Sequence, residues 1–135
     1  MAGFQRLPFT TMSDLFNHDS PAAVVQRQLD AYNARDVDAL LATYAPDARQ
    51  YEHPATLLAS GHEAMRERFA QRFQEPDLHA RLLQRVVMGN LVIDHEVVTR
   101  NFPEGKGAVE LVAIYEVVDG RIRSQSVQLG AKRLD

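Results

Sequence analysis

The sequence has no cysteine and no long apolar run. The lack of cysteine excludes disulfides, thiolate metal ligands and a cysteine nucleophile. It also fits a reducing cytoplasm, where we expect the protein to act. No apolar stretch reaches the roughly 20 residues needed to span a bilayer. The first twenty residues lack the basic start and continuous apolar segment of a secretory signal. We therefore expect neither a disulfide framework nor a membrane segment.

Clusters of basic residues are missing as well. The 15 Lys and Arg residues are scattered along the chain, and the net charge is −3. Nucleic acid and anionic membranes are therefore not expected as partners. The length of 135 residues and the hydrophobic fraction of 45% suit one globular domain. Residues 1–19 have weak periodicity, so we expect an N-terminal arm there and a single domain at 20–135.

Helix signals occupy the first part of this domain. Ser20 and Pro21 suit the N-cap and first position of a helix, and apolar residues recur at helical spacing after them. Asp36 is expected to cap a short second helix. The segment "SGHE" at 60–63 predicts a third helix with a capping box between Ser60 and Glu63. The expected apolar positions of these helices include Val25, Leu29, Tyr32, Val37, Leu40, Leu41, Tyr44, Met65, Phe69 and Phe73.

Strand patterns dominate the remainder of the chain. Asp119-Gly120 is a tight hairpin signal, and Gly89-Asn90 is a second turn signal. Because helices come first and a mostly antiparallel sheet follows, the predicted fold class is α+β. The expected strands lie at about 48–53 and at 77–88, 91–101, 108–118 and 121–129.

Three segments together resemble the NTF2-like domains, also described as SnoaL-like or ketosteroid-isomerase-like. They are "VVQRQLDAYNARDVDALLATYAPDA" at 24–48, "SGHEAMRERF" at 60–69 and "YEVVDGRIRS" at 115–124. The resemblance covers about residues 21–130. It implies a cone, in which a curved and mostly antiparallel sheet wraps around three helices and leaves a pocket at its open end. It also implies a homodimer formed through the outer face of the sheet.

This resemblance does not choose an activity, because the fold hosts isomerases, epoxide hydrolases, polyketide cyclases, dehydratases and proteins that only bind. The ketosteroid isomerases among them use a tyrosine, a carboxylate base and a protonated carboxylic acid. Gln28 stands at the position of the tyrosine and Ala113 at that of the acid. His53 stands at the position of the base, with Glu52 as a competitor. The chain therefore lacks the isomerase catalytic set.

The segment "QYEHPA" at 50–55 brings an amide, a phenol, a carboxylate and an imidazole together. An imidazole has a reference pKa near 6.5, which suits a general base at neutral pH. With the period of a strand, Tyr51 shares a face with His53, while Gln50 and Glu52 share the other. We expect His53 to be catalytic and Tyr51 to contact substrate. The alternative is a solvated histidine at the end of a strand.

The segment "DHE" at 94–96 lies inside an expected strand. Alternation places Asp94 and Glu96 on one face and His95 on the other, with Ile93, Val97 and Thr99. His95 is then either a satisfied core histidine or a second catalytic group that faces His53. Neighbouring residues of a strand point apart, so no metal site is expected here. Arg100 is expected to pair with Glu110 across a hairpin.

Four further residues are expected to contact substrate or line the core. Gln28 falls on the buried stripe of the first helix, where its amide must find either a ligand oxygen or backbone partners. Tyr32, Phe69 and Tyr115 lie on apolar faces of their elements. We expect a small, largely apolar ligand, no cofactor, and proton transfer by His53 in an isomerisation, a cyclisation or a hydration. The alternative is a non-catalytic module for small-molecule binding or dimerisation.

Overall fold

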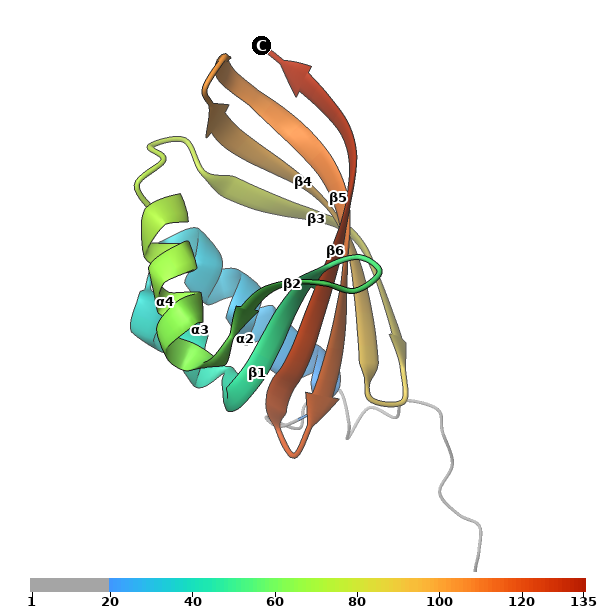
Figure 1. Ribbon diagram of the computed structural model, residues 1–135. Helices are drawn as coiled ribbons and strands as arrows, with labels where there is room; N and C mark the ends of the chain where they lie inside the picture. Colours follow the sequence, from blue (N-terminus) through green and yellow to red (C-terminus); the bar gives the residue numbers. More distant parts are fainter. Residues whose placement is uncertain (1–19) are drawn as a thin grey trace, which may run out of the picture.

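The computed structural model describes residues 20–135, so the expected arm at 1–19 lies outside the described residues. Helices lie on the concave side of one curved, six-stranded sheet (Figure 1). The helices are α2 (Pro21–Ala34), α3 (Val37–Ala42) and α4 (Gly61–Arg72). The strands are β1 (Tyr44–Glu52), β2 (Thr56–Ser60), β3 (His79–Met88), β4 (Leu91–Phe102), β5 (Gly105–Val118) and β6 (Arg121–Leu134).

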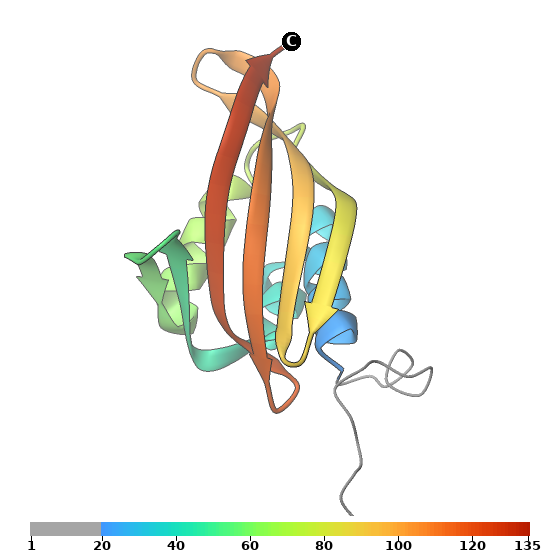
Figure 2. The same ribbon diagram turned by 90° about the vertical axis from the view of Figure 1, so that its right-hand side faces the viewer.

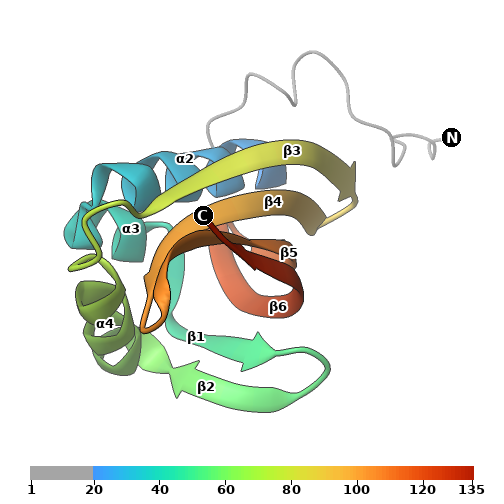
Figure 3. The same cartoon turned by 90° about the horizontal axis from the view of Figure 1, so that it is seen from above.

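The sheet is mixed, with the strand order β2-β1-β6-β5-β4-β3. Only β1 and β6 run parallel, and the other neighbours are antiparallel. Figure 2 shows β6, β5, β4 and β3 side by side, with the helices behind them. Seen from above, the sheet curls from β3 round to β2, and the helices lie along one side of the curl (Figure 3). The expected α+β cone is therefore confirmed.

The helix starts follow from local hydrogen bonds. The Ser20 side chain accepts from the Ala23 N–H at 3.2 Å, and Asp36 accepts from the Ala39 N–H at 3.0 Å. Both expected caps are confirmed. Ser60 is also the N-cap of α4, but its side chain makes no capping hydrogen bond, so the expected capping box is wrong.

The strands are longer than their patterns predict. β1 begins at Tyr44, and β6 continues to Leu134. The additional strand β2 pairs with β1; its sequence "TLLAS" is short and mostly exposed, so it carries little alternation. Asp119 and Gly120 join β5 to β6 with positive φ angles of 53° and 77°, as a type I′ turn requires.

The main core fills the space between the helices and the concave face of the sheet. Among the described residues, the largest side chains that are almost completely buried include Tyr44, Tyr115, Leu40, Met65 and Ile122. No helix within residues 20–135 is long and apolar enough to cross a membrane. The sheet and helices thus form one packed body whose open end carries the features described next.

Candidate functional site

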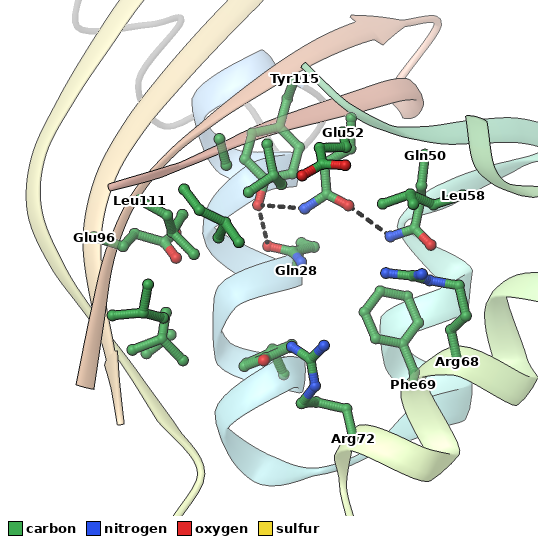
Figure 4. Close-up of a pocket in the computed structure, with 18 of the residues that line it drawn as sticks. Gln28, Gln50, Glu52, Leu58, Arg68, Phe69, Arg72, Glu96, Leu111 and Tyr115 are labelled. Carbon is green, nitrogen blue, oxygen red and sulfur yellow. Dashed lines mark hydrogen bonds between the residues drawn. The ribbon is translucent and has the colours of Figure 1, made fainter. Parts of the chain in front are cut away.

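A cavity of about 320 Å³ opens between α2, α4 and the concave face of the sheet (Figure 4). This volume lies at the lower end of the range typical of small-molecule sites. The walls are largely apolar, formed by Leu29, Leu58, Phe69, Ala80, Val98, Val109, Leu111, Ala113, Val127 and Leu129. The polar and aromatic lining comprises Gln28, Tyr32, Gln50, Tyr51, Glu52, Arg68, Arg72, Glu96, Arg100, Tyr115 and Gln125.

The residues expected to contact substrate all line this cavity. They come from four elements that are far apart in the sequence. The helices α2 and α4 cover the concave face of the sheet, and β1 and β5 contribute side chains from that face. These residues are Gln28, Tyr32, Tyr51, Phe69 and Tyr115.

His53, the expected general base, does not line the cavity. It is exposed in the turn after β1, where its backbone N–H donates to the Val127 carbonyl at 2.9 Å. Gln50, Tyr51 and Glu52 line the cavity instead. The register between β1 and β2 shifts between Gln50 and Tyr51, and such a bulge breaks the regular alternation on which the expectation depended.

His95 lies on the outer face of β4, and its Nε2 contacts a Glu110 carboxylate oxygen at 2.5 Å. Its side chain is 37% exposed, whereas Asp94 and Glu96 are buried. The alternation of side chains along β4 was predicted correctly, but Asp94 and Glu96, not His95, point to the inner face of the sheet. The expectation that His53 and His95 face one cavity is therefore wrong.

The expected pair of Arg100 with Glu110 is also wrong. Arg100 donates through two nitrogens to the carboxylate of Glu75, both at 2.8 Å. The Asn101 N–H donates to the same carboxylate at 2.8 Å. These bonds, followed by the nearby charge of Arg72, lower the pKa of Glu75 although partial burial opposes them. Glu75 therefore stays ionised and fixes Arg100 at the end of α4.

Glu96 is a buried carboxyl group that lines the cavity, and the sequence analysis did not select it as a site residue. Its cross-strand neighbours are Leu82 and Leu111, so it stands in an apolar row of the sheet. No hydrogen bond or ion pair joins its carboxyl group to another residue of the described part of the chain. Burial, together with the nearby charge of Asp94, raises the pKa of Glu96 to about 7, although Arg85 opposes this. In the sequence, the available signal for its burial was that Glu96 shares a strand face with the apolar residues Val92 and Val98.

Asp94 and Arg85 form a buried ion pair beside Glu96. The Arg85 Nε and its NH2 group donate to the two Asp94 oxygens at 2.7 and 2.9 Å. The Asp94 side chain is fully buried and that of Arg85 is 15% exposed. Another Arg85 nitrogen donates to Gln26 at 2.9 Å. This pair places the Asp94 carboxyl group two positions along β4 from Glu96.

A chain of side-chain hydrogen bonds crosses the closed end of the cavity. Gln50 donates to Gln125 at 2.6 Å, and Gln125 donates to the Tyr115 hydroxyl at 3.1 Å. Tyr115 donates to Gln28 at 3.2 Å, and the Gln28 amide approaches the Tyr44 hydroxyl at 3.4 Å. Burial raises the pKa of Tyr115 well above its usual value, so it remains a neutral phenol. The buried Gln50 Oε1 has no hydrogen-bond partner among residues 20–135.

Three arginines, which we call the arginine cluster, line the cavity where α4 faces β4. Arg68 and Arg72 lie on α4 and point toward the cavity (Figure 4), and Arg100 lies near the end of β4. Within residues 20–135, no group of three or more His, Asp or Glu side chains is placed to hold a metal ion. The charged side chains that line the cavity are those of Glu52, Glu96, Arg68, Arg72 and Arg100.

The family follows from a match over most of the chain. A model of the SnoaL-like domain matches residues 25–125. The chain belongs to the SnoaL-like domain family. No curated protein matches the chain in sequence. This SnoaL-like domain carries the NTF2-like fold that the resemblance predicted, without a tyrosine or a carboxylic acid at positions 28 and 113.

Solved structures of similar proteins share the fold of this SnoaL-like domain. An uncharacterised cystatin-fold protein from Novosphingobium aromaticivorans is 24% identical, with a TM-score of 0.74 over 79% of this chain and 96% of that one. A proposed polyketide cyclase from Sinorhizobium meliloti is 26% identical, with a TM-score of 0.65 over 78% and 93%. An epoxide hydrolase from Mycobacterium tuberculosis is 14% identical, with a TM-score of 0.69 over 82% of each chain.

Proposed function

We propose that this SnoaL-like protein binds a small, largely apolar molecule in the cavity and transfers a proton on it, with Glu96 as the general base. One observation carries the proposal: Glu96 is a buried cavity carboxyl group whose pKa is raised to about 7. A general base is most effective when its pKa lies near the working pH. A carboxyl group without a hydrogen-bond partner is also free to accept a proton from a ligand.

The proton would come from a carbon next to a carbonyl group. Glu96 takes this proton, and the carbonyl oxygen gains negative charge. The Gln28 amide has two N–H groups, of which one is directed at Tyr44, so the second can donate to that oxygen. Return of the proton to another carbon gives an isomerisation. Attack by the carbanion on a second carbonyl gives a cyclisation, and the name of the Sinorhizobium relative supports this class.

The proposal is tested by hydrogen exchange on 2-tetralone, an enolisable two-ring ketone. The protein should accelerate replacement of its α-protons by deuterium from D2O, followed by proton NMR. The rate should rise as the pH increases through about 7 and then level off, since the carboxylate form of Glu96 is the base. Exchange equal to that in buffer, although the ketone is bound, would contradict the proton-transfer proposal.

A second candidate is a binding module without catalysis. It is favoured by the hydrogen bonds of Gln28, whose amide is already bonded to Tyr115 and directed at Tyr44 within the protein. The two candidates differ in one measurable property. A binding module takes up 2-tetralone, seen by perturbed NMR signals of cavity residues, and leaves its exchange rate unchanged.

We also propose that two copies pair through the outer face of the sheet. On this face Ile93 on β4 lies beside Val86 on β3 and Ile114 on β5, which makes an apolar row across three strands. Val86, Met88 and the paired Leu91 are 45%, 74% and 39% exposed, and a contiguous exposed apolar patch of this kind marks an interaction surface.

Light scattering should therefore give the mass of a dimer for the wild-type protein. Ile93→Lys should give a monomer, because a charge in the centre of the row opposes burial. Leu57→Lys, at an exposed position on β2 near the opposite edge of the sheet, is the matched control and should remain dimeric. A monomeric wild-type protein would rule out the pairing.

A further inference from the structure

We infer that the ligand of this cavity is an amphipathic carboxylate, whose negative group is bound between Arg68 and Arg72 while its apolar part fills the cavity. The inference deepens the proposed function, because it assigns a substrate class to the same cavity. It rests on the placement and pairing of the arginine cluster rather than on the reactivity of Glu96. The two proposals can therefore fail separately.

The positive charge of the arginine cluster is incompletely neutralised. A smaller polar cavity of about 240 Å³ is lined by Arg68, Gln71, Arg72, Glu75 and Arg100, and the three arginines also line the main cavity. The lining of this smaller cavity thus contains three guanidinium groups and a single carboxylate, that of Glu75. That carboxylate is already bonded to Arg100 in a bidentate manner. The cluster therefore has room for a second anion.

Arg68 is the unpaired cation of the arginine cluster in the described part of the chain. Arg68 makes no hydrogen bond or ion pair with any residue in the described range 20–135. Partial burial and the charge of Arg72 lower the pKa of Arg68. Arg72 lies four residues further along α4, where like charges on a helix face repel each other. An anion placed between them would relieve this repulsion.

The guanidinium group of Arg72 uses only some of its hydrogen-bond donors within the protein. Its Nε lies 3.5 Å from a Glu75 oxygen, which is a long contact. The charge of Arg72 and its hydrogen bond to the Tyr32 side chain also oppose the rise that burial causes in the pKa of Tyr32. A guanidinium group has five N–H donors. Arg72 therefore keeps donors for a ligand, and paired arginines suit the two oxygens of a carboxylate.

Glu52, like Glu96, is a cavity carboxylate that competes with a bound anion for these arginines. It lines the same cavity from β1, and no ion pair joins it to Arg68. Figure 4 shows Arg68 and Arg72 pointing into the cavity from α4 and Glu52 pointing in from the sheet. Removal of the Glu52 charge should therefore strengthen the binding of an anion at the cluster.

The test compares two probes of the same shape, 2-naphthoate and 2-naphthamide, by calorimetric titration at pH 8. The wild-type protein should bind the carboxylate about 10-fold or more tightly than the amide, since charge-assisted hydrogen bonds are stronger than neutral ones. Arg68→Met should remove most of this preference and leave amide binding within about twofold. Glu52→Gln should increase the preference.

Arg66→Met is the matched control, because Arg66 lies on the same helix but pairs with Asp38 at 2.8 Å on the outside. It should keep the wild-type preference. Equal affinities for the two probes, no binding of either probe, or equal losses in Arg68→Met and Arg66→Met would each overturn the inference. A retained carboxylate preference without 2-tetralone exchange would leave the anion site standing and remove only the proton-transfer role of Glu96.

Discussion

Glu96→Gln should lower the rate of 2-tetralone exchange by about 10²- to 10⁴-fold, the usual contribution of a positioned general base. The substitution keeps the size and shape of the side chain and removes its ability to take a proton. Binding of the ketone should change little, because the cavity walls are apolar and unaltered. The measurement is the exchange rate at saturating ketone, followed by proton NMR at pH 8.

His53→Ala is the control for this result. His53 is exposed in the turn after β1 and does not line the cavity, so its loss should leave both exchange and stability near the wild-type values. If Glu96→Gln retains wild-type exchange while His53→Ala loses it, the assignment of the base made here is wrong and the histidine expected from the sequence takes its place.

Glu96→Gln should also change the stability of the protein in a pH-dependent manner. The pKa of Glu96 is raised from 4.5 to about 7 on folding, so the folded state binds more protons than the unfolded state between these values. The contribution of Glu96 to stability is then fully present below about pH 4.5 and is lost as the pH rises through about 7, by on the order of 3 kcal/mol. Glu96→Gln should be more stable than the wild type at pH 8 and similar to it at pH 4. Urea unfolding at both pH values measures the difference.

Arg85→Met should destabilise the protein by about 3–5 kcal/mol, the typical cost of breaking a buried ion pair by removing one partner. Asp94 would keep no cationic partner, and its side chain is fully buried. Such a loss is a large part of the 5–15 kcal/mol that usually holds a domain folded. Thermal and urea unfolding give the magnitude.

The double variant Arg85→Met, Asp94→Leu separates the broken pair from the loss of arginine packing. It should recover most of the lost stability, because a well-packed apolar pair can replace a buried ion pair. If Arg85→Met alone loses less than about 1 kcal/mol of stability, the buried Asp94 carboxyl group does not need Arg85 as its partner. Arg85 also holds down the pKa of Glu96, so exchange in folded Arg85→Met should require a higher pH.

Much of the fold could be predicted because its signals are local. The caps at Ser20 and Asp36 and the turn at Asp119 depend on residues within four positions of each other. β2 could not be predicted in this way, since its short sequence is ordered by pairing with β1 rather than by its own pattern.

The candidate site was harder to predict, because alternation identifies two faces of a strand but not which one is buried. Burial of the face that carries Asp94 depends on Arg85. The register between β3 and β4 places Arg85 directly opposite Asp94. No pattern within β4 contains this information. The same limit applies to His53, where a bulge in β1 brings Tyr51 and Glu52 to the cavity together.

The cavity is built from two kinds of wall. The buried carboxylates and the chain of amide and phenol groups are anchored mainly in paired strands, where a substitution disturbs the register or leaves a polar group without its partner. Arg68 and Arg72 stand on α4, and on the outside of this helix Arg66 forms an exposed ion pair with Asp38. A change at either arginine alters what the cavity recognises without altering the strands. Selection for a new ligand can therefore act on one helix face while the reactive groups of the sheet are conserved unchanged.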